Sequence, residues 1–247
     1  MKRTRCLWLV PLALLTLVAV LYAQDANTLL QQAEAAWVKR SASDQNVYEA
    51  IKLYEQAAKA APTNEVPLYQ IARAYYFLGR FAPAAKKDEL YLKGAEYAKR
   101  AFTLKPNKVG GHYWYAACMS RWLEPKSIAQ KLKYLSELKE HLLTARKLDP
   151  RFYFGGPSRA LGMIAFKSPF ASNKEAIQLL RESLSYFPDY SLTLVNLGEV
   201  LVKEKQYAEA KVHLQKVLGL SPMPGFEREL ADDKELAKKQ LALIPQG

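Results

Sequence analysis

Apolar residues recur along this chain at the three- and four-residue spacing of one helix face, and each apolar stretch ends at a proline. The terminal prolines lie 44, 44, 38 and 34 residues apart: Pro62, Pro106, Pro150, Pro188 and Pro222. Proline cannot continue a helix, because it lacks the N–H group and its ring clashes with the preceding turn. Even phasing over tens of residues is typical of stacked repeats. We therefore expect five helical hairpins, each of which buries its apolar face against the next.

The last hairpin, residues 191–222, has the clearest pattern. Its apolar and small positions are Leu194, Leu197, Gly198, Leu201, Tyr207, Ala210, Val217 and Pro222. This pattern resembles the tetratricopeptide repeat (TPR), a helix–turn–helix unit of 34 residues. We expect its helices over residues 192–203 and 207–218. Gly198 and Ala210 are small at the place where the two helices cross, so the helix axes can approach closely.

The earlier hairpins are less regular. Residues 27–39 and 45–60 are predicted to form the first one, with Asp44 as the cap of its second helix. The two 44-residue units hold about ten more residues than a standard repeat, which either lengthen their second helices or add a turn before them. Residues 226–244 read as a charged amphipathic helix that caps the end of the stack. The predicted fold class is all-α, an irregular TPR-like solenoid of helical hairpins with a C-terminal capping helix.

Residues 1–26 have the pattern of a signal peptide. A basic start precedes an apolar run over residues 7–22, and Ala23 or Ala26 can precede the cleavage point. Cleavage would release an exported, periplasmic protein whose repeat domain is residues 27–247. The alternative is an uncleaved anchor in the inner membrane, because the apolar run is close to the length that spans a bilayer.

Charge and cysteine content narrow the class of protein. The net charge of +12 falls to +9 without the export segment, and the remaining basic residues are scattered beside acidic ones, as on solvated helix faces. Nucleic-acid binding needs a concentrated basic stripe, so we expect no binding to nucleic acid.

Cleavage would also remove Cys6 and leave Cys118 without a partner for a disulfide. Cys118 lies in an apolar helix face, which predicts a buried, inert thiol.

The sequence offers no pattern for catalysis or metal binding. His112, His141 and His213 lie far apart, and none has a second ligand at metal spacing. Residues 156–160 partly match the nucleophile elbow of hydrolases, but that elbow needs a preceding strand, and here Pro157 opens a helix. We expect no enzymatic activity, no cofactor and no metal. The glycine pair Gly155-Gly156 in the segment 154–162, FGGPSRALG, instead predicts a tight corner that precedes a short helix over residues 158–167.

Residues of a Tyr-rich helix, of the glycine-containing corner and of the last repeat together resemble one known family. They are Tyr113-Trp114-Tyr115, Gly155-Gly156-Pro157, Arg159, Leu161-Gly162 and Asn196-Leu197. Together with the repeats and the final helix, they resemble the T-component family, exported TPR proteins associated with TRAP-type transporters for organic acids. The resemblance covers the chain from about residue 69 to its end. It implies an all-helical periplasmic protein that associates with the solute-binding protein of a transporter, and a homo-oligomer, since some members form trimers.

Repeat phasing independently indicates where a ligand would lie. The first helix of each hairpin should line a concave groove at fixed offsets from its small residue, which places a set of arginines and aromatic residues there. The candidate ligand-binding residues are Tyr69, Arg73, Tyr76, Tyr113, Arg121, Arg159, Met163 and Phe166. Such a groove suits an amphipathic carboxylate, because arginine forks bind carboxylates and aromatic rings hold an apolar tail. The alternative is a groove filled by a neighbouring helix.

These patterns predict an exported, non-enzymatic helical repeat protein. Its expected role is that of an accessory component that binds a TRAP-type solute-binding protein, an organic-acid or amphipathic ligand, or both. The alternative is a general scaffold for protein–protein interactions in the envelope, with no role in transport. Repeat scaffolds carry many unrelated binding functions, so the fold does not decide between these roles.

Overall fold

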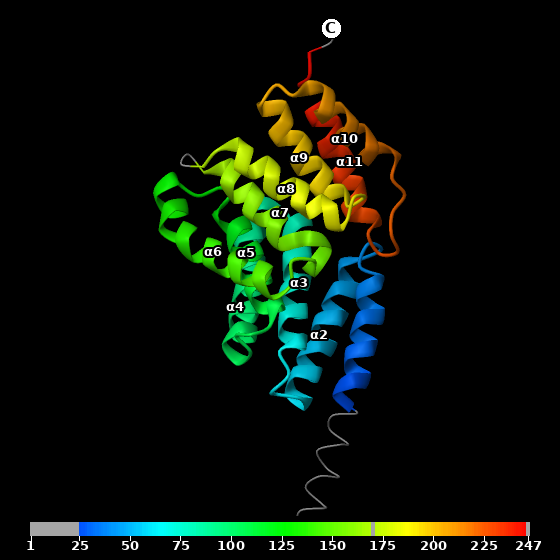
Figure 1. Ribbon diagram of the computed structural model, residues 1–247. Coiled ribbons are helices and arrows are strands. Elements are labelled where there is room, and N and C mark those ends of the chain that lie inside the picture. Colours follow the sequence, from blue (N-terminus) through cyan, green and yellow to red (C-terminus); the bar gives the residue numbers. More distant parts are fainter. Residues whose placement is uncertain (1–24, 169–170, 246–247) are drawn as a thin grey trace, which may run out of the picture.

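The computed structural model describes residues 25–168 and 171–245, which form helices and contain no strand. The predicted signal peptide lies almost wholly outside these residues. A first helix covers residues 25–38, and the labelled helices follow in order: α2 (Asp44–Ala60), α3 (Val66–Phe81), α4 (Ala84–Leu104), α5 (Val109–Leu123), α6 (Ile128–Leu148), α7 (Phe152–Lys167), α8 (Asn173–Tyr186), α9 (Ser191–Lys203), α10 (Tyr207–Gly219) and α11 (Glu227–Leu241). They pair into hairpins that stack into a curved solenoid, which confirms the predicted fold class (Figure 1).

Serine residues begin the second helix of three hairpins. These N-caps are Ser43 on α2, Ser127 on α6 and Ser172 on α8. The predicted cap at Asp44 is wrong by one position, because the Ser43 hydroxyl accepts the N–H of Gln45 over 3.1 Å. Asp44 is instead the first residue of the helix, where its negative charge faces the positive end of the helix dipole.

The extra residues of the two long units lengthen their second helices. Helices α4 and α6 have 21 residues each, whereas α8 has 14 and α10 has 13. In the last repeat, the predicted close crossing is present. A Cβ atom built on Gly198 would lie 2.5 Å from a methyl carbon of Leu214, so a larger residue here would force the Leu214 side chain to move. The helix pair follows the pattern that the sequence predicted.

The hydrophobic core consists of three clusters that follow one another along the stack. The first is built around Trp37, Tyr54 and Ile71, the second around Trp114, Cys118 and Leu142, and the third around Leu194, Leu201 and Leu214. The Cys118 side chain is fully buried, as predicted, and burial raises the pKa of its thiol. Among the described residues, none of the helices is long and apolar enough to cross a membrane.

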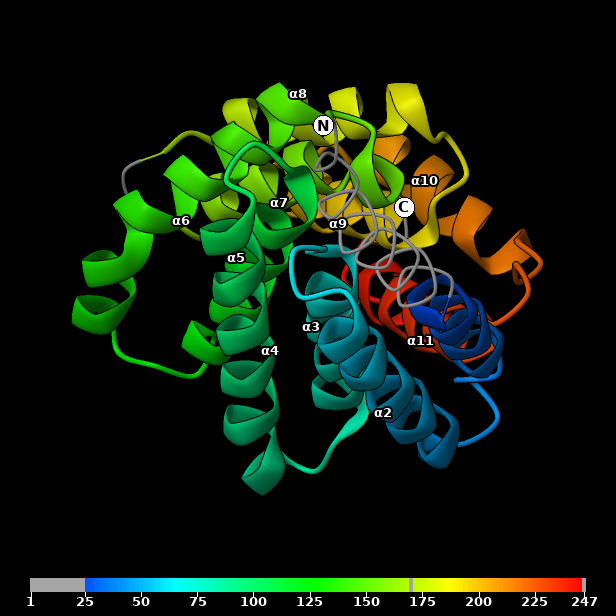
Figure 2. The ribbon, with the colours of Figure 1, turned by 90° about the horizontal axis from the view of Figure 1, so that it is seen from below.

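Helix α11 packs on α9 and α10, as a capping helix should, and it also reaches the N-terminal hairpins. Seen from below, α11 lies on the inner side of the curved stack, beside α3 and the first helix (Figure 2). Ion pairs join this end of the chain to the other: Arg40–Glu229, Arg80–Asp232, Arg80–Asp233 and Arg228–Asp44. The C-terminal helix therefore closes the curve, which the sequence pattern did not predict.

The corner before the fourth hairpin has an unusual backbone. Tyr153, Phe154 and Gly155 have φ values of 45°, 60° and 70°, so three consecutive residues adopt the left-handed conformation. The predicted corner is present. The three residues with non-helical backbone end at Gly155, so the regular part of α7 follows them, close to the expected helix over residues 158–167. A Cβ on Gly155 would lie 2.7 Å from the Ser183 hydroxyl, so this glycine is needed both for its conformation and for the close contact with α8.

Candidate functional site

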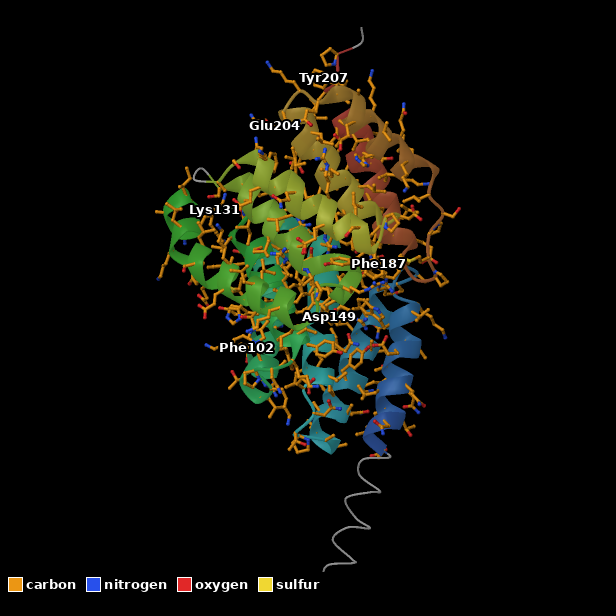
Figure 3. All side chains as sticks on the ribbon, viewed as in Figure 1. Phe102, Lys131, Asp149, Phe187, Glu204 and Tyr207 are labelled. Atoms are coloured by element: carbon orange, nitrogen blue, oxygen red, sulfur yellow. The ribbon has the colours of Figure 1, made fainter. Side chains whose placement is uncertain are left out.

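A pocket of about 410 Å³ opens where the C-terminal helix meets the first hairpin. Its volume lies within the range of about 300–1,000 Å³ that is usual for small-ligand sites. Phe187, which is labelled in Figure 3, lines the pocket at this junction. We call it the seam pocket, and its lining residues are Glu34, Trp37, Val38, Arg40, Arg73, Arg151, Tyr153, Phe154, Phe187, Pro224 and Phe226. They come from the first helix, α3, α7, the end of α8 and the loop before α11, so the pocket depends on the closure of the solenoid.

One wall of the seam pocket is built on Trp37. The guanidinium carbons of Arg40 and Arg73 lie 4.5 and 4.3 Å from the centre of its ring. Arg73 Nη2 donates to Glu34 Oε1 over 2.7 Å, and the Tyr54 hydroxyl donates to the same oxygen over 2.5 Å. Burial raises the pKa of Tyr54 well above its usual value, so the hydroxyl keeps its proton and remains a donor. These contacts fix the position of Arg73, yet its Nε is buried without a hydrogen-bond partner.

The other wall is built on Phe154. Its ring stacks on Tyr190 with 4.5 Å between ring centres, and it meets Phe187 and Phe226 edge-on, each at 5.5 Å. Phe154 and the preceding Tyr153 are the two aromatic residues with positive φ in the described part of the chain. Bulky residues rarely adopt this conformation, and each such residue costs on the order of 1–3 kcal/mol. The strained backbone places two aromatic side chains side by side in the pocket wall.

Arg151 contributes a guanidinium group that forms no ion pair among the described residues. Its guanidinium carbon lies 5.9 Å from the ring centre of Tyr186 and 5.5 Å from that of Phe187. The backbone N–H of Arg151 donates to the Asp149 carboxylate over 2.9 Å, which holds the start of the corner. The Arg151 side chain itself is exposed, so its donors face the solvent at the mouth of the pocket.

Two of the predicted ligand-binding residues, Tyr76 and Arg121, contact each other away from the seam pocket. Arg121 Nε donates to the Tyr76 hydroxyl over 3.2 Å, and Arg121 Nη1 pairs with Glu124 over 3.2 Å. Burial by itself would raise the pKa of Tyr76, but the positive charges of Arg121, Arg80 and Arg159 outweigh it and lower this pKa. The guanidinium of Arg121 is thus already engaged by side chains of α3 and α5.

Arg159 and Tyr113, two more predicted residues, also form a pair. Arg159 Nη2 donates to the Tyr113 hydroxyl over 2.8 Å, and Nη1 donates to the carbonyl oxygen of Phe154 over 3.3 Å. The guanidinium also lies 4.9 Å from the ring centre of Tyr190, and only 5% of the residue is exposed. Arg159 therefore supports the strained corner from behind the seam pocket. A carboxylate at Arg159, as the sequence predicted, would have to displace these partners.

The remaining predicted residues are part of the packing. The ring of Tyr69 meets Phe152 edge-on at 6.1 Å, and Met163 and Phe166 pack against the third core cluster, which includes Ala237 of α11. At this end, the predicted groove residues therefore belong to a core cluster that also includes residues of the C-terminal helix. Of the eight predicted residues, Arg73 is the one that lines the seam pocket.

Sequence reasoning missed most of the seam pocket because its residues belong to different hairpins. Trp37 lies at the end of the first helix and Arg40 just after it, whereas Phe226 lies about 190 positions later, just before α11. No repeat period relates these positions. The signal that was present is the odd segment at residues 154–162, since its first residue, Phe154, is the centre of one wall.

Comparison with known proteins places the chain among helical repeat proteins. A family model described as "Regulator of microtubule dynamics protein 1-3" matches residues 29–154, just over half of the chain. A tetratricopeptide repeat model matches residues 172–223. The mouse (Mus musculus) protein named regulator of microtubule dynamics protein 1 is 23% identical over 231 residues, which cover 86% of this chain and 72% of that protein.

Two solved structures share the fold. One is a thermophilic TPR protein of Thermus thermophilus, with a TM-score of 0.66 and 19% identity over 87% of this chain and 99% of that chain. The other is pilF of Pseudomonas aeruginosa, with a TM-score of 0.56 and 14% identity over 89% of this chain and 90% of that chain. Both likenesses establish a TPR-type arrangement of helices.

Proposed function

Because this chain belongs to the regulator of microtubule dynamics protein 1-3 family and folds as a TPR-type stack, we propose that it is a non-enzymatic scaffold that binds a protein partner through the seam pocket. Stacked helical repeats use extended surfaces to hold other proteins. The observation that carries the proposal is the seam pocket, where arginines and aromatic rings, the residues that dominate binding energy at protein interfaces, lie together beside a strained backbone.

Two classes of partner follow from two different observations. The name of the mouse relative connects that protein with the regulation of microtubule dynamics, so a microtubule-associated partner is the first class. The resemblance to the T-component family supports the second class, the solute-binding protein of a TRAP-type transporter. The second class requires export, and we propose that residues 1–26 are removed during it. A chain of full-length mass in the native envelope would contradict this removal and favour the uncleaved anchor.

The test compares the proteins that co-purify with three forms of the full chain, expressed in the native organism and cross-linked before lysis. The pocket variant is Arg151→Glu, and the matched control is Lys131→Glu. Both residues are exposed, and Figure 3 shows Lys131 on α6, away from the junction that Phe187 marks. We expect a protein that is recovered with the wild type and with Lys131→Glu and is lost with Arg151→Glu.

The identity of that protein separates the roles. A solute-binding protein supports the transport role. Tubulin or a tubulin-binding protein supports a role in microtubule dynamics, which the name of the mouse relative indicates for that protein. Any other pocket-dependent protein supports a general scaffold. If no protein depends on Arg151 for its recovery, the scaffold proposal for this pocket is wrong.

A further inference from the structure

The charges that line the seam pocket do not balance. Three of its lining residues are the arginines Arg40, Arg73 and Arg151, and Glu34 is the acidic one. Arg40 is neutralised from outside the lining by Glu229 of α11, with 2.8 Å between Nη2 and Oε1. Glu34 pairs with Arg73. Of the charged residues that line the pocket, Arg151 is therefore the one whose side chain has no ion-pair partner among the described residues.

Two guanidinium groups in the pocket also keep unused hydrogen-bond donors. Arg73 uses Nη2 for Glu34 and Tyr54, but its Nε is buried and unpaired. Arg151 has no carboxylate partner in the part of the chain that the structure describes. A planar guanidinium presents its donors as a fork that matches the two oxygens of a carboxylate, and such charge-assisted pairs are stronger than neutral hydrogen bonds. The free donors therefore favour an anionic group on the ligand.

The rest of the pocket surface favours an apolar group next to that anion. Phe154, Phe187 and Phe226 form an edge-to-face cluster, and Arg151 lies over the Phe187 ring at 5.5 Å. The anion-binding donors of Arg151 and the aromatic surface are thus adjacent. The volume of about 410 Å³ lies near the lower end of the range for ligand sites, so the pocket suits one side chain or a small molecule and not a whole helix.

We infer that the seam pocket binds a hydrophobic carboxylate. Its carboxylate lies at the guanidinium groups of Arg151 and Arg73, and its aromatic or branched apolar group lies against Phe154, Phe187 and Phe226. The inference rests on the proposed function only because both concern the seam pocket. Two sources carry this chemistry, the C-terminal residue of a protein partner and a free organic acid, and the experiment below separates them.

Isothermal titration calorimetry on the purified full chain tests the inference with defined probes. N-acetyl-phenylalanine and 3-phenylpropionate represent a free acid. An eight-residue peptide of alanine and serine that ends in phenylalanine represents a protein C-terminus. The corresponding amides of the amino acid and the peptide have the same ring without the negative charge. We expect the acids to bind and the amides to bind at least about tenfold more weakly, since the charge-assisted pairs are lost.

Two variants connect the binding to the pocket. Arg151→Gln is expected to weaken binding of the acids by about ten- to a hundredfold, because it removes the free guanidinium. Arg181→Gln is the matched control, because Arg181 is exposed on α8 and pairs with Glu209 outside the pocket. Arg181→Gln should leave the affinity unchanged. Equal thermal midpoints of the two variants and the wild type confirm that both are folded.

The outcomes are distinct. Tighter binding of the peptide acid than of the small acids identifies a protein C-terminus, and equal binding identifies a free acid; both support a carboxylate site. The inference is wrong if no acid binds, if the amides bind as well as the acids, if phenyl phosphate binds better than 3-phenylpropionate, or if Arg151→Gln has no effect. If a small acid binds but no protein partner depends on the pocket for its recovery, the scaffold proposal is wrong and the carboxylate site is still supported.

Discussion

At the scale of single residues, a histidine pair between α5 and α6 gives the fold a dependence on pH. His112 and His141 place their Nδ1 atoms 2.8 Å apart, and His112 Nε2 lies 2.8 Å from the Pro106 carbonyl oxygen. The carbonyl can only accept, so in the neutral pair His112 Nε2 donates to it and His141 Nδ1 donates to His112. Burial and then the charge of His112 lower the pKa of His141 below its usual 6.5, and together they outweigh nearby glutamates.

The stability of the wild type should therefore fall as the pH drops below 6.5. A lowered pKa in the folded state means that the unfolded chain binds more protons at His141, so the free energy of unfolding rises with pH in this window. The variant His141→Gln keeps a donor toward His112 and cannot be charged. Urea unfolding at about pH 8 and about pH 5.5 should show the wild type losing stability relative to the variant at the lower pH. A difference between the two proteins that does not change with pH would contradict this prediction.

The buried hydrogen bonds of Arg159 lead to a second prediction, about the stability of the protein. The variant Arg159→Lys keeps the positive charge but loses the fork that joins the Tyr113 hydroxyl to the Phe154 carbonyl. We expect the free energy of unfolding in urea to fall by about 1–3 kcal/mol, because buried polar partners lose their hydrogen bonds. Arg181→Lys, at an exposed ion pair, should change it by no more than about 0.5 kcal/mol. Equal effects of the two substitutions would mean that Arg159 does not hold the corner.

Single residues were predictable from the sequence only where their neighbours along the chain decide their surroundings. The burial of Cys118 follows from the apolar residues on both sides of it on one helix face. The partner of Arg159 does not follow in this way, because Tyr113 lies 46 residues earlier on α5. Which arginine meets which tyrosine depends on the register of the lengthened hairpins, and no sequence period fixes that register.

At the scale of elements, the corner at the start of α7 is a strained feature of the backbone. Gly155→Ala places a methyl group 2.7 Å from the Ser183 hydroxyl at a φ of 70°. We expect a loss of about 1–3 kcal/mol in the free energy of unfolding. Gly219→Ala is the matched control, because a Cβ there meets nothing within 4 Å. It should be neutral or stabilise the protein slightly, by up to about 1 kcal/mol. Similar effects of both substitutions would show that the corner stores no strain.

The elements themselves were largely predictable, and the physical reason is proline and glycine chemistry. Pro62, Pro106, Pro150, Pro188 and Pro222 each follow the end of a helix, so the hairpins and their order could be read from the sequence. The conformation of Tyr153 and Phe154 could not, because aromatic residues ordinarily avoid positive φ. The packing of α7 against α8 and the hydrogen bond from Arg159 to Phe154 hold that segment in place.

At the scale of the whole molecule, the closure by α11 joins residues that no local pattern relates. Asp233 is 1% exposed, and its carboxylate accepts from Arg80 Nη2 over 2.5 Å and from the Ser191 hydroxyl over 2.6 Å. These contacts tie α11 to α3 and α9 at once. The sequence predicted a helix that caps the last hairpin, which is correct for α9 and α10. It did not predict the contact with α3, because charged residues on an amphipathic helix usually face solvent.

The closure of the solenoid by α11 leads to a prediction that would not hold for an open solenoid. Asp233→Asn keeps the shape of the side chain and removes the charge that Arg80 faces, so we expect a loss of about 1.5–3 kcal/mol in the free energy of unfolding. Hydrogen exchange should reveal where the loss occurs. If α11 holds the two ends together, amide protection falls both in α11 and in the first helix, residues 25–38, because Glu229 and Arg40 separate when α11 loosens.

The control for this prediction lies on the same helix. Glu235→Gln removes an exposed ion pair with Lys238, which should cost no more than about 0.5 kcal/mol and leave protection of the first helix unchanged. If Asp233→Asn lowers protection in α11 alone, the two ends of the chain are independent, and the seam pocket would not depend on α11. If protection falls at both ends, the pocket and the closure are one unit. A ligand that binds between Arg151, Phe187 and Phe226 would then also slow exchange in residues 25–38, because it stabilises the closed state of the solenoid.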